Sequence, residues 1–193
     1  QFGTRPLLTQ ESEISDEWKS RLTSLQNGDV SLHKFSPTGF YSSAVRNEFL
    51  EDLHQRSDRQ VRYSRTAEAD LHVGIPLGRR GRPIYVREDD ADKVKAWLEA
   101  GYTEGMPTPD DTMVFVTPES ALTIKKDQID CMGCLSQCQF SNWEQHEGTT
   151  GKRADPRSFC IQKTLQSIAH GADVEHELMF AGHNAYKFGE DPF

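Results

Sequence analysis

The residues best suited to chemistry are the four cysteines of the chain. Three of them lie within the eight residues 131–138 and the fourth follows after a longer gap; they are Cys131, Cys134, Cys138 and Cys160. Three thiols so close in sequence converge on one object only where the backbone turns tightly, and Gly133 permits such a turn. The pattern therefore indicates a metal centre.

The spacing C-x2-C-x3-C with a distant fourth cysteine favours iron over zinc. Structural zinc usually takes two separated pairs of ligands, whereas a three-plus-one arrangement is common in iron–sulfur sites. A cubane cluster takes one thiolate per iron, which matches the count of four. Disulfides belong to oxidising compartments, and the chain shows no secretory signal. We expect a [4Fe-4S] cluster, with zinc or four ordinary thiols as the alternatives.

The cysteine run resembles a known cluster-binding segment, and aromatic and basic residues lie near it in the sequence. The run resembles the cluster-binding segment of flavin-containing reductases of the dienoyl-CoA reductase and trimethylamine dehydrogenase type. Their fourth cysteine lies closer than Cys160 does, so the resemblance covers only the cluster-binding knuckle. Phe140 and Trp143 would shield a cluster from water or form local core. Arg153 and Arg157 would either offset the charge of a cluster or lie on the solvated surface.

The composition limits the classes of function. At 193 residues the chain can bury one sizeable core or two small ones, and 35% hydrophobic with 27% charged residues is ordinary for an intracellular enzyme. No apolar run is long enough to cross a membrane. A net charge of −8, with no face rich in lysine and arginine, argues against nucleic acid as the main partner. We expect a cytoplasmic protein that binds neither membranes nor nucleic acids.

The first residues predict a ligand site of another kind. Residues 1–9 have no initiator methionine or polar leader and are typical of the end of a strand that runs into a loop, so the chain looks like a fragment. Gly3 permits a close approach of the backbone, and Thr4 offers a hydroxyl beside its own N–H. Together they favour a phosphate at the carboxyl end of a strand.

Residues 1–12 resemble the Q-x-G-T-R-F-L-x-T-x-E-S segment of the nitronate monooxygenase family, which also includes flavin-dependent enoyl-ACP reductases. In that family the segment is the last barrel strand and the loop after it. The resemblance implies that Gln1, Gly3 and Thr4 help to hold the phosphate of FMN. Pro6 stands where the family has phenylalanine, outside the phosphate loop.

Two other stretches extend this resemblance. Residues 36–50 are similar to the family segment T-G-R-x-A-R-G-x-x-N-x-F, although its second arginine is replaced in the region of residues 41–43, which bears on substrate access and specificity. Residues 178–186 resemble the closing A-G-Q-x-A segment, with His183 in place of glutamine. His183 is therefore a candidate substrate contact, while the principal catalytic base of the family would lie before Gln1. Within residues 36–50, the residues that match the family segment are Thr38, Gly39, Arg46, Asn47 and Phe49.

The resemblance implies an α/β fold, namely the carboxyl-terminal part of a (β/α)8 TIM barrel with an inserted small α+β domain that carries the cysteines. Residues 1–54 would form the last barrel strand, the phosphate loop and the following helix. Residues 55–172 would form the insertion, and residues 173–193 the return to the barrel. The amino-terminal remainder of the barrel is then a required partner, and an oligomer is compatible with this fold.

The implied function is that of an FMN-dependent oxidoreductase that acts on a small-molecule substrate. A nitronate or another substrate carbanion would reduce the flavin, which passes the electrons to oxygen or another acceptor. A cluster near the flavin suits single-electron transfer and favours an external electron donor or acceptor. The fragment alone would be inactive because most of the barrel is absent. The alternatives are a flavin-dependent enoyl-thioester reductase and a non-catalytic, zinc-stabilised interaction module.

Hydrophobic periodicity and capping residues predict the elements that position these sites. A helix is expected from Ser15 to Gly28. Val30 and Leu32 are expected on one face of the next strand, with His33 as a polar position on the other. The remaining expectations are a helix over 43–53, a hairpin of 71–77 with 84–86, a helix over 90–101, a strand over 113–116, a helix from Thr117 towards Cys131, and a helix from Cys160 to Gly171.

Overall fold

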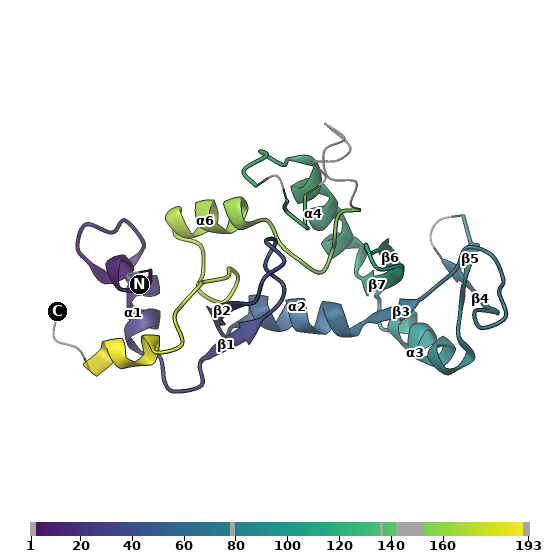
Figure 1. The fold of residues 1–193 in the computed structure, drawn as a ribbon, viewed down its shortest axis with the longest axis horizontal. Helices are drawn as coiled ribbons and strands as arrows, with labels where there is room; N and C mark the ends of the chain where they lie inside the picture. Colours follow the sequence, from purple (N-terminus) through teal and green to yellow (C-terminus); the bar gives the residue numbers. More distant parts are fainter. Residues whose placement is uncertain (1–2, 78–79, 136, 142–152, 191–193) are drawn as a thin grey trace. The chain divides into compact units, whose positions relative to one another are not determined.

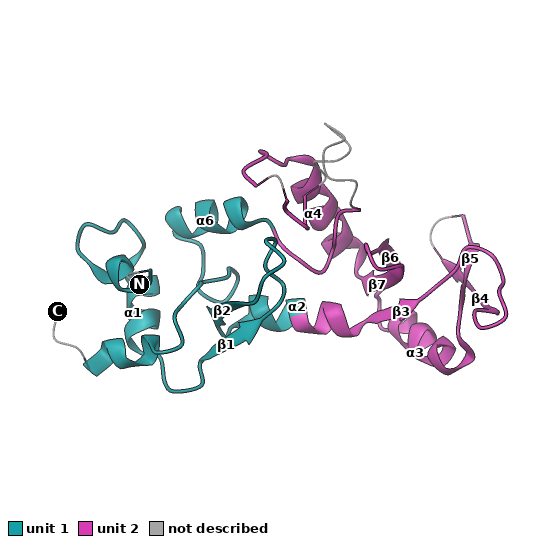
Figure 2. Ribbon diagram, in the orientation of Figure 1, with its two compact units in different colours: residues 1–53, 160–193 teal, residues 54–159 magenta. Residues whose placement is uncertain are grey.

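The computed structural model describes residues 3–77, 80–135, 137–141 and 153–190 (Figure 1). The chain divides into two compact units: unit 1 is Gln1–Leu53 with Cys160–Phe193, and unit 2 is His54–Phe159 (Figure 2). Unit 1 is therefore made of two segments that are separated in sequence by unit 2. Cys160 and the helix after it, which the sequence expectation assigns to the insertion, group with unit 1.

Unit 1 combines short helices with a two-stranded hairpin. Strand β1 (Val30–His33) pairs antiparallel with β2 (Ser42–Val45), and Ala44 of β2 bridges to Phe180 in the second segment. The other elements are the 3-10 helix η1 (Arg5–Leu8), α1 (Asp16–Thr23), the first half of α2 (Glu48–Asp58), α6 (Ile161–Ala169) and the 3-10 helix η2 (Ala185–Glu190).

The hydrophobic core of unit 1 joins its two segments. Trp18 and Leu22 on α1 are fully buried, and the indole N–H of Trp18 donates to the carbonyl oxygen of Ala172 at 2.7 Å. Apolar burial, worth about 25 cal/mol per Å², holds the segments together. The core residues are Trp18, Leu22, Leu25, Val30 and Val45 from the first segment and Ile168, Met179, Ala181 and Ala185 from the second.

Unit 2 combines small antiparallel sheets with helices. Its core surrounds Val86, Val94 and Phe115, which have no exposed surface. The hairpin predicted from residues 71–77 and 84–86 is confirmed. The sheets are β3 (Gln60–Arg62), β7 (Thr112–Val116) and β6 (Glu104–Pro107) in that order, and β4 (Val73–Leu77) with β5 (Arg82–Val86); the helices are α3 (Glu88–Glu99) and α4 (Pro118–Ile129).

These elements confirm the expected mixture of helices and strands. In the described residues all strand pairings are antiparallel, and the sheets are small and open. A (β/α)8 barrel is built from parallel strands. The described part of the chain therefore contains no closed barrel. No helix within it is long and apolar enough to cross a membrane.

Three helix ends lie where the sequence predicts them, because nearby side chains fix them. The Ser15 hydroxyl accepts the N–H of Trp18 at the start of α1, and the Thr117 hydroxyl accepts that of Ser120 at the start of α4. Gly101 follows α3 with a φ of 96°, a left-handed conformation that glycine adopts without strain.

The helix predicted over residues 43–53 is wrong in its first half. Residues 42–45 form strand β2, and α2 begins only at Glu48. Asn47 marks the change, because its Oδ1 accepts the N–H of Leu50 as a helix cap does. Pairing with β1 therefore overrides the helix pattern as far as that cap.

The burial of strand β1 follows the predicted alternation only in part, since Val30 is buried as expected but Leu32 and His33 are exchanged. Leu32 is 64% exposed, whereas His33 is buried. The imidazole of His33 stacks on Phe35 and Phe180, with ring centroids 5.7 and 6.4 Å away, and its Nδ1 accepts the N–H of Phe35. Since Phe180 comes from the second segment of unit 1, local alternation does not predict this burial.

Candidate functional site

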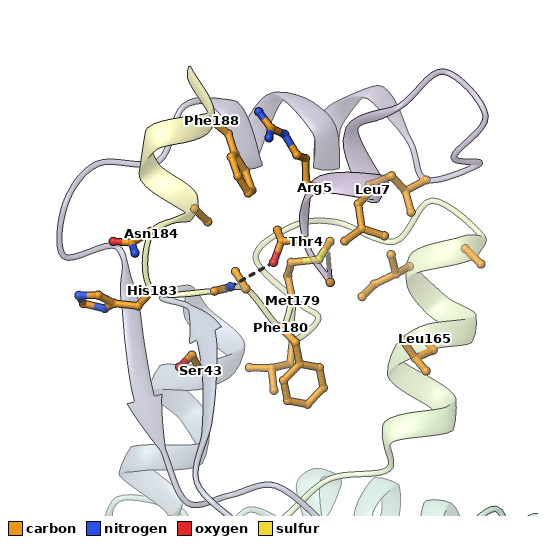
Figure 3. Close-up of a pocket in the computed structure, with 18 residues that line it drawn as sticks. Thr4, Arg5, Leu7, Ser43, Leu165, Met179, Phe180, His183, Asn184 and Phe188 are labelled. Atoms are coloured by element: carbon orange, nitrogen blue, oxygen red, sulfur yellow. Dashed lines mark hydrogen bonds between the residues drawn. The ribbon is translucent and has the colours of Figure 1, made fainter. Parts of the chain in front are cut away.

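A pocket of about 850 Å³ opens in unit 1 (Figure 3). Small-molecule sites usually measure roughly 300–1,000 Å³, so this pocket has the size of a ligand site. Most of its lining is apolar and comes from α6, from the residues before η2 and from η2 itself. The apolar lining includes Leu165, Ile168, Met179, Phe180 and Phe188.

The polar rim of the pocket is formed by both ends of unit 1. Thr4, at the N-cap position of η1, accepts the backbone N–H of Gly182 at its Oγ1, 3.1 Å away. A Cβ added at Gly3 would meet no atom within 4 Å, so open space lies beside this residue. Arg5 also lines the pocket. Gln1, the third residue expected at the phosphate, lies outside the described residues.

All three stretches that carry the family resemblance contribute to this pocket. Gly3 and Thr4 belong to the first stretch, Ser43 belongs to residues 36–50, and Leu178 to Ala185 belong to the closing stretch. The described part of the first stretch, residues 3–12, contains the 3-10 helix η1 and no strand. The sequence predicts α6 as a helix, but it gives no signal that Leu165 and Ile168 of this helix also line the pocket.

His183 lies on the rim of the pocket and not in its interior. Its side chain is exposed, and Figure 3 shows the imidazole extending away from Thr4 and Met179. It can therefore meet a ligand that reaches the rim. The apolar wall of the pocket offers no titratable group between Leu178 and Ala181.

The cysteine segment follows α4 directly within unit 2. Asp130 is the C-cap of α4, so the helix delivers Cys131 as the sequence predicts. The backbone N–H of Gly133, which has a φ of 69°, donates to the sulfur of Cys131 at 3.4 Å. No disulfide joins the four cysteines; Cys134 is exposed and the others are partly buried.

Cys138 lies in a more apolar environment than Cys134. Burial raises the pKa of its thiol, N–H groups of Phe140 and Ser141 oppose this shift, and the thiol of Cys131 adds to it. Cys131 and Cys138 are therefore close enough to interact, and amide donors reach both sulfurs. Such donors stabilise a thiolate, and a bound metal removes the thiol proton outright.

The fourth cysteine belongs to the other unit. Cys160 is the N-cap residue of α6 in unit 1, and its side chain makes no capping hydrogen bond. Among the described residues, no three His, Cys, Asp or Glu side chains converge closely enough to hold a metal ion. Cysteine thiols with amide donors at two of the sulfurs are nevertheless donors of the kind that iron–sulfur clusters and zinc take. Phe140 is buried, and Trp143 lies outside the described residues.

Comparison with known proteins finds no relative: no family model, no curated protein and no solved structure matches the chain. The functional argument therefore rests on the residues themselves and on the resemblance that they carry.

The two arginines near the cysteines are part of the fold of unit 2. Arg153 donates to the carbonyl oxygen of Thr108 at 3.0 Å. Arg157 forms ion pairs with Asp155 at 2.8 Å and with Asp110 at 3.0 Å, and the hydrogen bonds to Asp155 raise its pKa. The sequence alone offers no signal for this network, because Asp110 lies far from Arg157 along the chain.

Proposed function

We propose that the chain is the carboxyl-terminal part of an FMN-dependent oxidoreductase similar to the nitronate monooxygenases. The observation that supports this is that all three family-like stretches line the same pocket of unit 1. Stretches so far apart in sequence have no local reason to meet. In this proposal unit 1 belongs to the last part of a (β/α)8 barrel, and unit 2 is a domain inserted into it.

The polar rim of the pocket is the proposed site for the phosphate of FMN. Gly3 leaves open space for ligand atoms, the Thr4 hydroxyl lies at the rim, and Arg5 contributes a positive charge nearby. The apolar wall formed by Leu165 and Phe180 suits the uncharged part of a ligand. Bound FMN would supply electron transfer in steps of one or two electrons. His183 is the proposed rim contact for the substrate.

The four cysteines are the proposed ligands of a [4Fe-4S] cluster that exchanges electrons between the flavin and an external donor or acceptor. Support comes from the absence of a disulfide between any of the four cysteines and from the amide donors at Cys131 and Cys138. Hydrogen bonds to sulfur are one of the means by which proteins set cluster potentials. A reducing compartment keeps such thiols available, so we propose a cytoplasmic location.

The first experiment measures iron, sulfide, zinc and FMN in the whole protein that contains this chain, purified without oxygen. About four irons with equal sulfide, together with bound FMN, are the expected result. One zinc without iron would replace the cluster with a structural metal and favour the interaction module. Absence of both metals would refute the metal centre, and absence of flavin would refute the flavoenzyme.

Paired variants assign each cofactor to its residues. Thr4→Val should weaken FMN binding about 10- to 100-fold, because a lost hydrogen bond to a charged group costs about 1.5–3 kcal/mol. Thr9→Val is the matched control, since Thr9 is exposed and its hydroxyl bonds the carbonyl oxygen of Pro6 and the carboxylate of Glu11, which do not line the pocket. Equal FMN occupancy in both variants would refute the role of Thr4.

A second pair tests the metal. Cys134→Ser should abolish metal binding, whereas Met132→Leu, an exposed position in the same segment, should retain it. Unchanged metal content in Cys134→Ser would exclude that thiol as a ligand. Substrate assays then separate the two flavoenzymes: nitronate-dependent flavin reduction supports the proposal, and NAD(P)H-dependent reduction of an enoyl thioester supports the reductase alternative.

A further inference from the structure

The residues just before Cys160 are fixed to unit 2 by the guanidinium of Arg157. Its Nε and Nη2 donate to the two carboxylate oxygens of Asp155 at 3.0 and 2.8 Å. Its Nη1 donates to Asp110 and to Gln60, each at 3.0 Å. The side chains of Arg157 and Asp155 are only 19% and 12% exposed. The network therefore joins residues 155–157 to strand β3 and to the β6–β7 loop.

The β6–β7 loop is a rigid partner for Arg157. Thr108 is fully buried, and its hydroxyl bonds the hydroxyl of Thr112 at 2.7 Å and the carboxylate of Asp110. The backbone closes the same loop, because the N–H of Thr108 donates to the carbonyl oxygen of Thr112 at 2.9 Å. Asp110 is thus fixed in place before it meets the guanidinium.

The same network aligns the backbone on both sides of the cysteines. The N–H of Asp155 donates to the carbonyl oxygen of Gln139 at 2.7 Å. Gln139 follows Cys138 directly, and Asp155 precedes Cys160 by five residues. The chain after the third cysteine and the chain before the fourth are therefore paired through this bond.

A second arginine supports the same segment from another side. Arg56, at the end of α2, donates to the carbonyl oxygen of Pro156 at 3.1 Å. Ser158 and Phe159 are buried, as are Phe140 and Ser141 on the opposite flank. Arg157 differs from Arg56 because only its planar fork bonds the Asp155 carboxylate through two nitrogens at once.

We propose that Arg157 is a positioning residue that aligns the two flanks of the cysteine set before the metal binds. This inference rests on the metal centre proposed above. A ligand set that is already ordered binds its metal more tightly, because less conformational entropy is lost on binding. Asp155 and Asp110 hold the guanidinium, and the backbone bond between Asp155 and Gln139 transmits its position to the cysteine segment.

The test compares metal release from the loaded protein to a chelator, at a temperature below the unfolding of every variant. Arg157→Met should release metal about 10- to 100-fold faster, the range found when partners behind metal ligands are removed. Arg157→Lys keeps the charge but not the two-nitrogen bond, so its rate of metal release should lie between those of the parent and Arg157→Met. Arg82→Met, at an exposed position of β5 in the same unit, is the matched control and should release metal at the parent rate.

Hydrogen exchange of the metal-free protein separates positioning from general stability. Arg157→Met should speed exchange in residues 137–141 and 153–159 and leave α3, in the same unit, unchanged. Parent-like release rates, or an equal increase of exchange in α3, would overturn the proposal. If Arg157→Met does not fold, Asp110→Asn removes the charge of one partner of the guanidinium and should give smaller increases in metal release and in exchange of the same residues.

The two proposals fail in different ways. If the parent protein binds no metal, the metal centre is wrong, and the exchange experiment still decides whether Arg157 aligns the two flanks. If the parent binds metal but Arg157→Met releases it normally, the metal centre stands and the positioning role is wrong.

Discussion

Replacing Asn47 by alanine tests how the two segments of unit 1 are joined. Its Oδ1 caps α2 through the N–H of Leu50 at 3.0 Å, and its Nδ2 donates to the carbonyl oxygens of Val174 at 2.8 Å and Glu177 at 2.6 Å. Loss of the cap costs about 1 kcal/mol, and each lost bond to a partly buried carbonyl about 1 kcal/mol more. We therefore expect Asn47→Ala to destabilise unit 1 by about 3 kcal/mol.

Hydrogen exchange measures this change in one unit at a time. A loss of about 3 kcal/mol corresponds to roughly 150-fold faster exchange of amides that open with unit 1. Peptides that cover residues 47–53 and 172–180 should show it, and peptides from α3 in unit 2 should not. Asn27→Ala, an exposed turn position, is the control and should leave both units unchanged.

Asn47→Asp separates the cap from the link between segments. Aspartate keeps the acceptor for Leu50, but it loses both donors and sets a carboxylate against two carbonyl oxygens. If the link matters most, Asn47→Asp should destabilise unit 1 at least as much as alanine does. The reasoning is refuted if Asn47→Asp exchanges like the parent, or if Asn47→Ala costs less than about 1 kcal/mol.

Three further predictions concern packing and charge. Gly189→Ala should destabilise unit 1 by about 1–3 kcal/mol in thermal unfolding, because its Cβ would collide with the backbone oxygen of Thr23, whereas Gly3→Ala meets no atom and should be neutral. Gln128→Met should raise the melting temperature by the equivalent of about 1 kcal/mol, since the buried Nε2 has no hydrogen-bond partner among the described residues; an unchanged or lower value would contradict this. Although burial raises the pKa of Asp110, hydrogen bonds from Thr108 and Arg157 and the guanidinium charge lower it to about 2. The resulting stability, about 1 kcal/mol after allowance for solvent screening, is present above pH 4 and lost between about pH 4 and 2, and acid titration of Asp110→Asn should lack that loss.

Features fixed by neighbouring residues could be predicted from the sequence. Ser15 and Thr117 cap helices through amides three residues away, and Gly101 adopts the left-handed conformation that ends α3. The hairpin of β4 and β5 needs only alternation and a turn. The cysteine spacing is likewise local, so the candidate metal ligands can be named without a structure. In each case the whole cause lies within a few residues.

Features fixed by distant residues could not be predicted. His33 is buried because Phe180, from the other segment of unit 1, covers it. Arg157 is largely buried, because it forms an ion pair with Asp110 on the β6–β7 loop. The pocket of unit 1 is likewise lined by residues of η1, β2 and α6 together, so no short stretch of sequence predicts it. Tertiary contacts decide these positions, whatever the local pattern indicates.

The division of unit 1 into two segments bears on the order of events during synthesis. Unit 2 is continuous and can fold as soon as it leaves the ribosome. The hydrogen bond from the Trp18 indole, in contrast, forms only after Ala172 has been synthesised. At about 5–20 residues per second, translation of the intervening unit delays that contact by roughly 5–20 s. During this interval the apolar face of α1 is exposed. A chaperone that shields the nascent amino-terminal segment would therefore act on unit 1 and not on unit 2.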